Sequence, residues 1–215
     1  MTAWIYCLLV LLISLTFILL RVIFCLPFCR LQDVGPVLDE PFSVLVLLGS
    51  GGHTGEMLNI LSQLDHKFRY SFIVQSNDES SVLRLEKSKV KGTVYTVPRA
   101  RNVGDGILRS VQGTLKCWLG TMKVLLFDKK LKQGNIPSVL LVNGPGSCVP
   151  LAYSIVILNI LGVANTRIIY MESLTRVNEL SLSGKLLYLV ADRFVVQWPE
   201  LAQKYRRTEY HGILV

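Results

Sequence analysis

The first twenty residues of this chain contain no charged side chain. Apolar sequence runs from Trp4 to Leu20 and, after the single Arg21, continues to Leu26. A helix of about 20 apolar residues matches the roughly 30 Å hydrocarbon core of a bilayer. The basic n-region and small-residue cleavage site of a signal peptide are both missing. Residues 1–26 are therefore predicted to form an uncleaved transmembrane anchor.

The distribution of charge around this segment predicts its orientation. Only the terminal amine precedes it, whereas Arg21 and Arg30 follow it. The positive-inside rule then places the body of the protein in the cytosol and the amino terminus on the lumenal or external side. Arg21 is expected to snorkel toward the interface at one end, and Trp4 fits an aromatic belt at the other.

Metal-binding patterns are also missing. The five cysteines form no CxxC pair, and the three histidines form no cluster at ligand spacing; the cysteines are Cys7, Cys25, Cys29, Cys117 and Cys148. No metal site is expected. Free thiols agree with a body in the reducing cytosol. Cys25 and Cys29 lie beside the predicted membrane segment, where they are either acylated or plain interfacial thiols.

A net charge of +8 suits an anionic membrane surface, a phosphorylated substrate or a nucleic acid. The sequence has no basic-aromatic motif of the kind that binds nucleic acid, and a membrane anchor makes such a partner a poor expectation. No nucleic-acid partner is predicted.

The remainder of the chain has the pattern of an α/β protein. A linker is expected over 27–41 and a single domain over 42–215. Short apolar runs, typical of buried parallel strands, alternate with helical stretches, which predicts a Rossmann-like, doubly wound parallel sheet. Strands are expected at 42–48, 70–75, 93–97, 139–142, 167–171 and 194–197, and helices at 54–64, 80–87, 105–127, 148–161 and 182–190. The apolar helix at 148–161 is short for a span and is expected to lie in the core or to touch the membrane surface.

A glycine-rich loop, GSGGHTGE, follows the first predicted strand at 49–56. Thr54 occupies the position of the third glycine of a dinucleotide fingerprint, and the usual ribose-binding acid is missing. The Gly-Lys-Ser/Thr of a P-loop is missing too. What remains is a turn that places His53 near a helix amino terminus, where a neutral ring is favoured. His53 either bonds the turn or contacts a phosphate or reacting hydroxyl, while Glu56 is interpreted as an acid that complements the helix dipole.

Further polar residues follow other predicted strands, at the same edge of the sheet. A second loop, NGPGS at 143–147, contributes Asn143, Gly144 and Gly146, with Ser147 as a helix cap. Glu172 either orders a loop through Arg176 or binds substrate hydroxyls. Arg99 and Arg101 either hold a diphosphate or form a solvated basic loop.

Five stretches in order resemble a known family: VLLGSGGHTGE (46–56), VNGPGSCVP (142–150), YMES (170–173), LSGK (182–185) and VVQWP (195–199). They are similar to the membrane-anchoring subunit of the two-subunit N-acetylglucosaminyltransferase that adds the second N-acetylglucosamine to dolichyl-diphosphate-linked N-acetylglucosamine. The family also resembles the amino-terminal half of the bacterial cell-wall precursor transferase, a GT-B fold of two Rossmann-like domains.

The resemblance implies a subunit at the endoplasmic reticulum membrane that anchors a soluble, donor-binding partner and forms the acceptor side of the cleft. UDP-N-acetylglucosamine would be the donor, with no resident cofactor. His53 would be the catalytic base or orient the acceptor. The implied substrate-binding residues are Gly51, Gly52, Thr54, Arg99, Arg101, Asn143, Gly144, Gly146 and Glu172.

The carboxyl-terminal residues 209–215 are expected to form a last strand, and Gly212, Ile213, Leu214 and Val215 to dock the partner, because a single-chain GT-B enzyme would continue there into its second domain. Two alternatives remain open. One is a non-catalytic scaffold that only recruits the partner to the membrane, and the other is a membrane-bound oxidoreductase with a nucleotide cofactor, which the glycine spacing disfavours.

Overall fold

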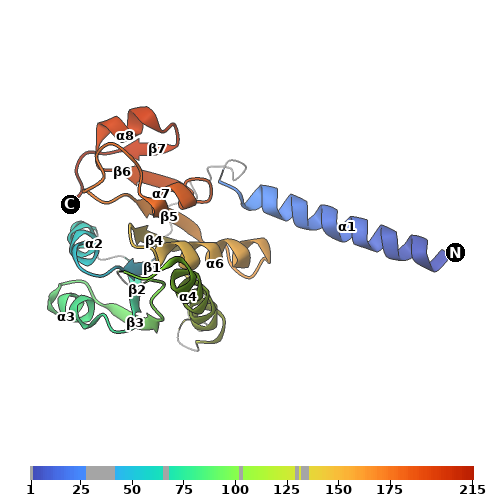
Figure 1. Ribbon diagram of the computed structural model, residues 1–215, viewed down its shortest axis with the longest axis horizontal. Helices are drawn as coiled ribbons and strands as arrows, with labels where there is room; N and C mark the ends of the chain where they lie inside the picture. Colours follow the sequence, from blue (N-terminus) through green and yellow to red (C-terminus); the bar gives the residue numbers. More distant parts are fainter. Residues whose placement is uncertain (1, 28–41, 65–67, 102–103, 129–130, 132–135) are drawn as a thin grey trace.

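The computed structural model describes residues 2–27, 42–64, 68–101, 104–128, 131 and 136–215. It begins with a long apolar helix, α1 (Thr2–Cys25), that projects from the body of the molecule (Figure 1). The stretch Trp4–Cys25 is long and apolar enough to cross a membrane. Most of the predicted linker 27–41, with Cys29 and Arg30, lies outside the described residues.

The body contains one parallel sheet of seven strands in the order β3-β2-β1-β4-β5-β6-β7. The direction of strand addition reverses between β1 and β4, as in a doubly wound Rossmann fold, so the predicted fold is confirmed. The strands are β1 (Ser43–Leu48), β2 (Arg69–Gln75), β3 (Gly92–Val97), β4 (Val139–Asn143), β5 (Arg167–Met171), β6 (Arg193–Val196) and β7 (Thr208–Tyr210).

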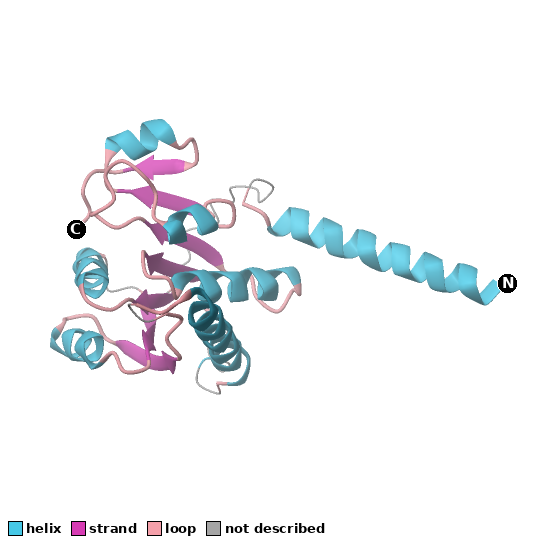
Figure 2. Cartoon of the chain, in the orientation of Figure 1, coloured by secondary structure: helices cyan, strands magenta, loops and turns pink. Residues whose placement is uncertain are grey.

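Helices cover both faces of this sheet (Figure 2). One face of β1 points Leu45 and Leu47 toward a core shared with α4 (Ile107–Phe127), α6 (Cys148–Ile160), α7 (Leu182–Leu187) and α8 (Pro199–Lys204). The other face points Val46 and Leu48 toward α2 (Gly52–Gln63) and α3 (Glu79–Lys87). Because alternate residues of a strand point to opposite faces, a continuous apolar run such as β1 is buried on both sides.

The carboxyl-terminal part differs from the sequence expectation. A last strand is present as expected, but it is shorter than 209–215: β7 ends at Tyr210, and residues 211–215 form no strand. Leu214 and Val215 instead pack, half-buried, against the core on the α2 side of the sheet. Helix α8 was missed, since its six residues are too few to show a helical hydrophobic period.

Candidate functional site

The first glycine loop begins where β1 ends, at the carboxyl edge of the sheet. Gly51 has φ +69°, a conformation that a side chain would strain, and it precedes the first turn of α2. No side chain caps this helix amino terminus. The first-turn N–H groups of α2 therefore lie beside an exposed Gly51–Gly52 turn, in the arrangement that suits an anion.

The second glycine loop, which follows β4, packs directly against the first. A Cβ atom added to Gly144 would lie 2.3 Å from His53 Cε1, so only glycine admits the imidazole here. Asn143 Nδ2 donates to the His53 carbonyl oxygen at 2.9 Å. Two loops that are about ninety residues apart in the sequence thus hold one histidine between them.

Glu56 lies on the same side of α2 as His53, one turn later. Its Oε2 is 3.6 Å from His53 Nδ1, which is an ion-pair distance rather than a hydrogen bond, and accepts from Asn143 Nδ2 at 3.3 Å. Its Oε1 accepts from Ser173 Oγ at 2.9 Å. Burial acts to raise the pKa of Glu56, but its contacts with His53 and Ser173 outweigh this and hold the pKa below its usual value.

This carboxylate fixes how the histidine is presented. Nδ1 of His53 is buried without a hydrogen-bond partner among the described residues and lies 3.6 Å from Glu56 Oε2, while 30% of the side chain remains exposed. The exposed part of the ring therefore lies away from Nδ1, and Glu56 favours the tautomer with the proton on Nδ1 and a free lone pair on Nε2. From the sequence, Glu56 was expected only to complement the helix dipole. Its spacing of three residues from His53 could have predicted the contact, because residues i and i+3 of a helix are neighbours.

The second loop uses its own helix amino terminus differently. The N–H groups of Cys148 and Val149 donate to the carbonyls of Pro145 and Gly146, at 2.9 and 3.4 Å. Ser147 does not cap α6 with its side chain, contrary to expectation; its hydroxyl is bonded to Gln75 Nε2. The second loop therefore positions His53, and the first loop offers free backbone donors.

Thr54 does not present its side chain to the site. The residue is completely buried, and Oγ1 bonds the Gly49 carbonyl and, at 2.6 Å, Ser81 Oγ. The helical turn carries the Thr54 hydroxyl toward the core, where it shapes the loop, and substrate binding by Thr54 stays a prediction.

The Glu172 side chain is buried and forms hydrogen bonds within the fold. Only 1% of it is exposed, and its carboxylate accepts from Ser173 N at 3.1 Å and from the N–H and hydroxyl of Ser181 at 2.9 and 3.1 Å. It thus orders the loop after β5, but through Ser181 and not through Arg176. The expected substrate contact of Glu172 stays a prediction, while these donors surround its carboxylate.

The two arginines after β3 have different neighbours. Arg99 reaches the first glycine loop, where Nη2 donates to Ser50 Oγ at 3.2 Å. Arg101 lines a groove of about 590 Å³ between α4 and α6, together with apolar residues such as Val111, Trp118 and Tyr153. Arg99 therefore remains a candidate for a phosphate at the glycine loop, and the joint binding of a diphosphate by both guanidiniums stays a prediction.

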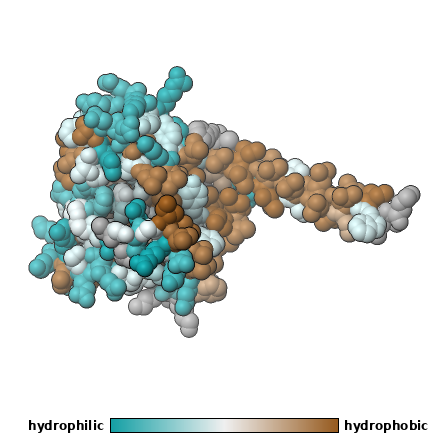
Figure 3. Space-filling view, viewed as in Figure 1, coloured by the Kyte–Doolittle hydropathy of each residue, from teal (hydrophilic) through white to brown (hydrophobic). Residues whose placement is uncertain are grey.

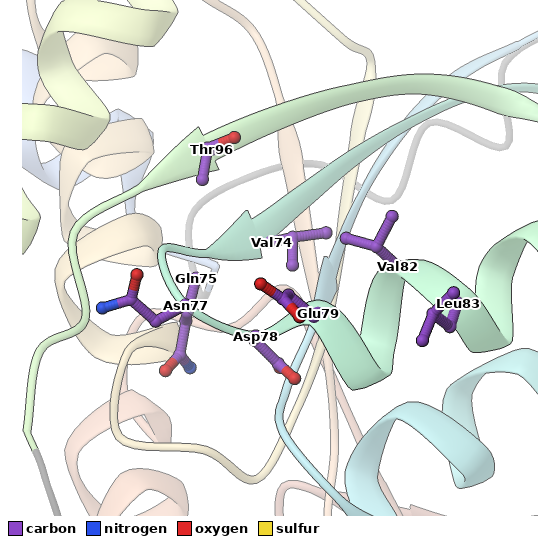
Figure 4. A pocket seen from close by; sticks show the side chains of 8 residues that line it. All are labelled: Val74, Gln75, Asn77, Asp78, Glu79, Val82, Leu83 and Thr96. Carbon is purple, nitrogen blue, oxygen red and sulfur yellow. The ribbon is translucent and has the colours of Figure 1, made fainter.

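A smaller hollow of about 350 Å³ lies at the ends of β2 and β3, beside α3 (Figure 4). Asp78 lines it near the place where a dinucleotide fold carries its ribose-binding acid. Its carboxylate accepts from Ser81 N at 3.2 Å and Ser80 Oγ at 2.8 Å, and so caps α3. Because the Asp78 carboxylate caps α3, its role agrees with the absence of a dinucleotide fingerprint in the sequence.

A scan of protein families finds one model, "Oligosaccharide biosynthesis protein Alg14 like", that matches residues 44–214. The chain belongs to the Alg14 family. It is 42% identical over 206 residues to the UDP-N-acetylglucosamine transferase subunit ALG14 of Candida albicans, covering 92% of this chain and 91% of that protein. It is 35% identical over 200 residues to the human subunit of the same name, covering 86% and 88%. The resemblance deduced from the five motifs is confirmed.

Solved structures with the same fold as this Alg14-family chain are glycosyltransferases of the GT-B type. Acinetobacter baumannii MurG superimposes with a TM-score of 0.53 at 18% identity, over 74% of this chain and 43% of MurG. A UDP-glucosyltransferase from Polygonum tinctorium gives a TM-score of 0.54 at 14% identity, over 83% and 53%. The chain thus spans about half the length of these proteins and has the fold of one GT-B half.

Proposed function

We propose that this chain is a subunit of a glycosyltransferase that transfers N-acetylglucosamine from UDP-N-acetylglucosamine to dolichyl-diphosphate-linked N-acetylglucosamine, and that it forms the acceptor side of the cleft. The observation that carries this proposal is the position of His53. It is held between two glycine loops, and its Nδ1 lies 3.6 Å from Glu56 Oε2. The names of the Alg14 relatives support the donor, and the resemblance of the motifs suggests the acceptor.

The proposed chemistry uses His53 as the base. The Nε2 lone pair accepts the proton of the acceptor 4-hydroxyl as its oxygen attacks the anomeric carbon of the donor sugar. The bond to UDP breaks, UDP leaves with the electron pair, and the configuration inverts. Glu56 stabilises the imidazolium that forms, while the first-turn N–H groups of α2 and Arg99 bind the acceptor diphosphate.

The donor side is proposed to come from a soluble partner subunit. The chain covers 91% of its Candida relative but only 43% of MurG, so a second chain would supply the remaining GT-B half. The segment Gly212–Val215 is the proposed docking site, because Ile213 is 55% exposed beside the half-buried Leu214.

The proposed location is the endoplasmic reticulum membrane, with α1 as a single span, the amino terminus in the lumen and the body in the cytosol. The exposed apolar surface along α1 and the placement of Arg21 near its carboxyl end support this arrangement (Figure 3).

The deciding experiment is His53→Ala in the chain co-expressed with its soluble partner. Transfer to the lipid-diphosphate acceptor should fall by roughly 10²–10⁴-fold, the usual contribution of a general base. Co-purification of the partner should be unchanged, and Asn59→Ala, on the exposed side of the same helix, should retain full activity. Full activity of the His53→Ala pair would instead indicate a scaffold that only recruits the catalyst.

A further inference from the structure

Arg21, near the end of α1, is bonded to the far end of α6. Its Nε donates to the Ile160 carbonyl and its Nη2 to the Asn159 carbonyl, both at 3.1 Å. The last carbonyls of a helix have no partner within it and carry the negative end of the helix dipole. A guanidinium therefore binds this end through both hydrogen bonds and charge.

Gly162, which follows the end of α6, lies beside the Arg21 guanidinium. Gly162 has φ +73°, and its N–H and that of Val163 donate back to Asn159 and Leu158 at 3.0 and 2.9 Å, which closes the helix in a Schellman motif. A Cβ atom on Gly162 would lie 2.8 Å from Arg21 Nη2. The turn therefore both ends the helix and accommodates the guanidinium.

This end of α6 is itself fastened to the sheet. The Asn159 side chain exchanges two hydrogen bonds with the backbone of Thr166, at 2.8 and 3.0 Å. The Thr166 hydroxyl donates to the Pro137 carbonyl at 2.6 Å. Because Thr166 lies one residue before β5 and Pro137 two residues before β4, Arg21 is attached to the rigid core of the body and not to a loop.

The opposite end of α6 carries the second glycine loop, which packs on His53. The helix has 13 residues, so it separates the Arg21 contact from that loop by about 20 Å. Figure 1 shows α6 extending from the sheet toward the root of α1. One rigid helix thus connects the candidate membrane span to the histidine of the site.

We propose that Arg21 is a positioning residue: by bonding the end of α6 it fixes the body relative to α1 and thereby sets the height and tilt of the His53 site above the bilayer. This role rests on the proposed function, because height matters only for an acceptor held in the membrane. It also replaces the expected snorkelling of Arg21 toward lipid headgroups with a contact inside the protein.

The test compares two acceptors with the full complex in lipid vesicles. One acceptor is the polyprenyl-diphosphate sugar in the bilayer, and the other is a water-soluble analogue with a short alkyl chain. Arg21→Leu keeps α1 apolar and should lower transfer to the bilayer acceptor about tenfold, since misplacement of reacting groups is costly, while transfer to the soluble acceptor stays unchanged. Lys87→Leu, which removes one exposed positive charge on α3, should change neither rate.

Further variants separate positioning from folding or topology. Arg21→Lys, which keeps a cationic donor, should restore part of the loss, and protease accessibility should show an unchanged orientation of the body. Equal rates for Arg21→Leu and Lys87→Leu on the bilayer acceptor, or equal losses on both acceptors, would overturn the role. Inactivity of the unmodified complex on both acceptors would overturn the proposed function itself.

Discussion

Glu56 is the residue whose role changes most between the sequence and the folded chain. Its partners Asn143 and Ser173 lie 87 and 117 residues away in the sequence, so no local sequence pattern predicts these contacts. Together they hold a charged carboxylate against the buried edge of His53. The contacts with His53 and Ser173 hold the pKa of Glu56 below its usual value, although burial acts to raise it.

Replacing Glu56 by Gln should lower both activity and stability. Because a charged hydrogen-bond acceptor is lost, the free energy of unfolding should fall by about 1–2 kcal/mol near neutral pH. Because the pKa of Glu56 is lower in the folded than in the unfolded chain, its stabilisation is complete above the unfolded value of about 4.5 and is lost as the pH falls through the folded value. The stability difference between the two proteins should therefore shrink on acidification.

The measurements are thermal unfolding of both proteins at neutral and acidic pH, and transfer by the complex at neutral pH. Turnover of Glu56→Gln should fall roughly tenfold or more, because the imidazolium loses its stabilising charge. Glu86→Gln, on the exposed surface of α3, is the matched control and should resemble the unmodified chain. A stability difference that is constant with pH would contradict the assignment.

Among the elements, the two glycine loops have distinct parts in the site. The first exposes the start of α2, and the second supplies Gly144 as the wall behind His53. Helix α4 approaches the segment after β3 closely as well, since Cβ atoms on Gly113 and Gly120 would lie 2.4 Å from Ala100 O and Pro98 Cδ. These contacts fix the segment that carries Arg99.

Gly144→Ala should displace the imidazole and lower turnover by about 10²-fold, as expected when a reacting group is moved by about an ångström. Its positive φ of 54° adds a stability cost of about 1–2 kcal/mol. Gly106→Ala is the control, because Gly106 has negative φ and open space around its Cα. Both are measured by transfer assays and thermal unfolding; normal turnover in Gly144→Ala would show that the loop does not position His53.

For the molecule as a whole, the carboxyl-terminal segment joins the body at two points. Gln197 Oε1 accepts from Leu214 N at 3.0 Å, and Gln63 Nε2 donates to the Leu214 carbonyl at 3.4 Å. Leu214 and Val215 then pack beside α2. The segment is thereby held in a defined position while Ile213 faces outward.

Ile213→Asp should weaken association with the partner subunit about tenfold or more, since a charge would enter an apolar contact, while the free energy of unfolding changes by less than about 0.5 kcal/mol. Pull-down with the partner and thermal unfolding separate the two effects. Leu214→Asp is the contrasting variant, because it should destabilise the body as well. Undiminished partner binding by Ile213→Asp would remove this segment from the proposed interface.

The sequence by itself determined the apolar helix, the alternation of strands and helices, and the two glycine loops, because runs, periods and turn residues are properties of neighbours along the chain. Only the tertiary structure decided which of the candidate residues meet. The Thr54 and Glu172 side chains are buried, Arg99 bonds the first glycine loop, and Arg101 lines the groove between α4 and α6. Glu56 lies beside His53, and Arg21 bonds α6 across 138 residues. These outcomes depend on how strands order in the sheet and which way each helical turn faces, and that is settled by packing against distant parts of the chain.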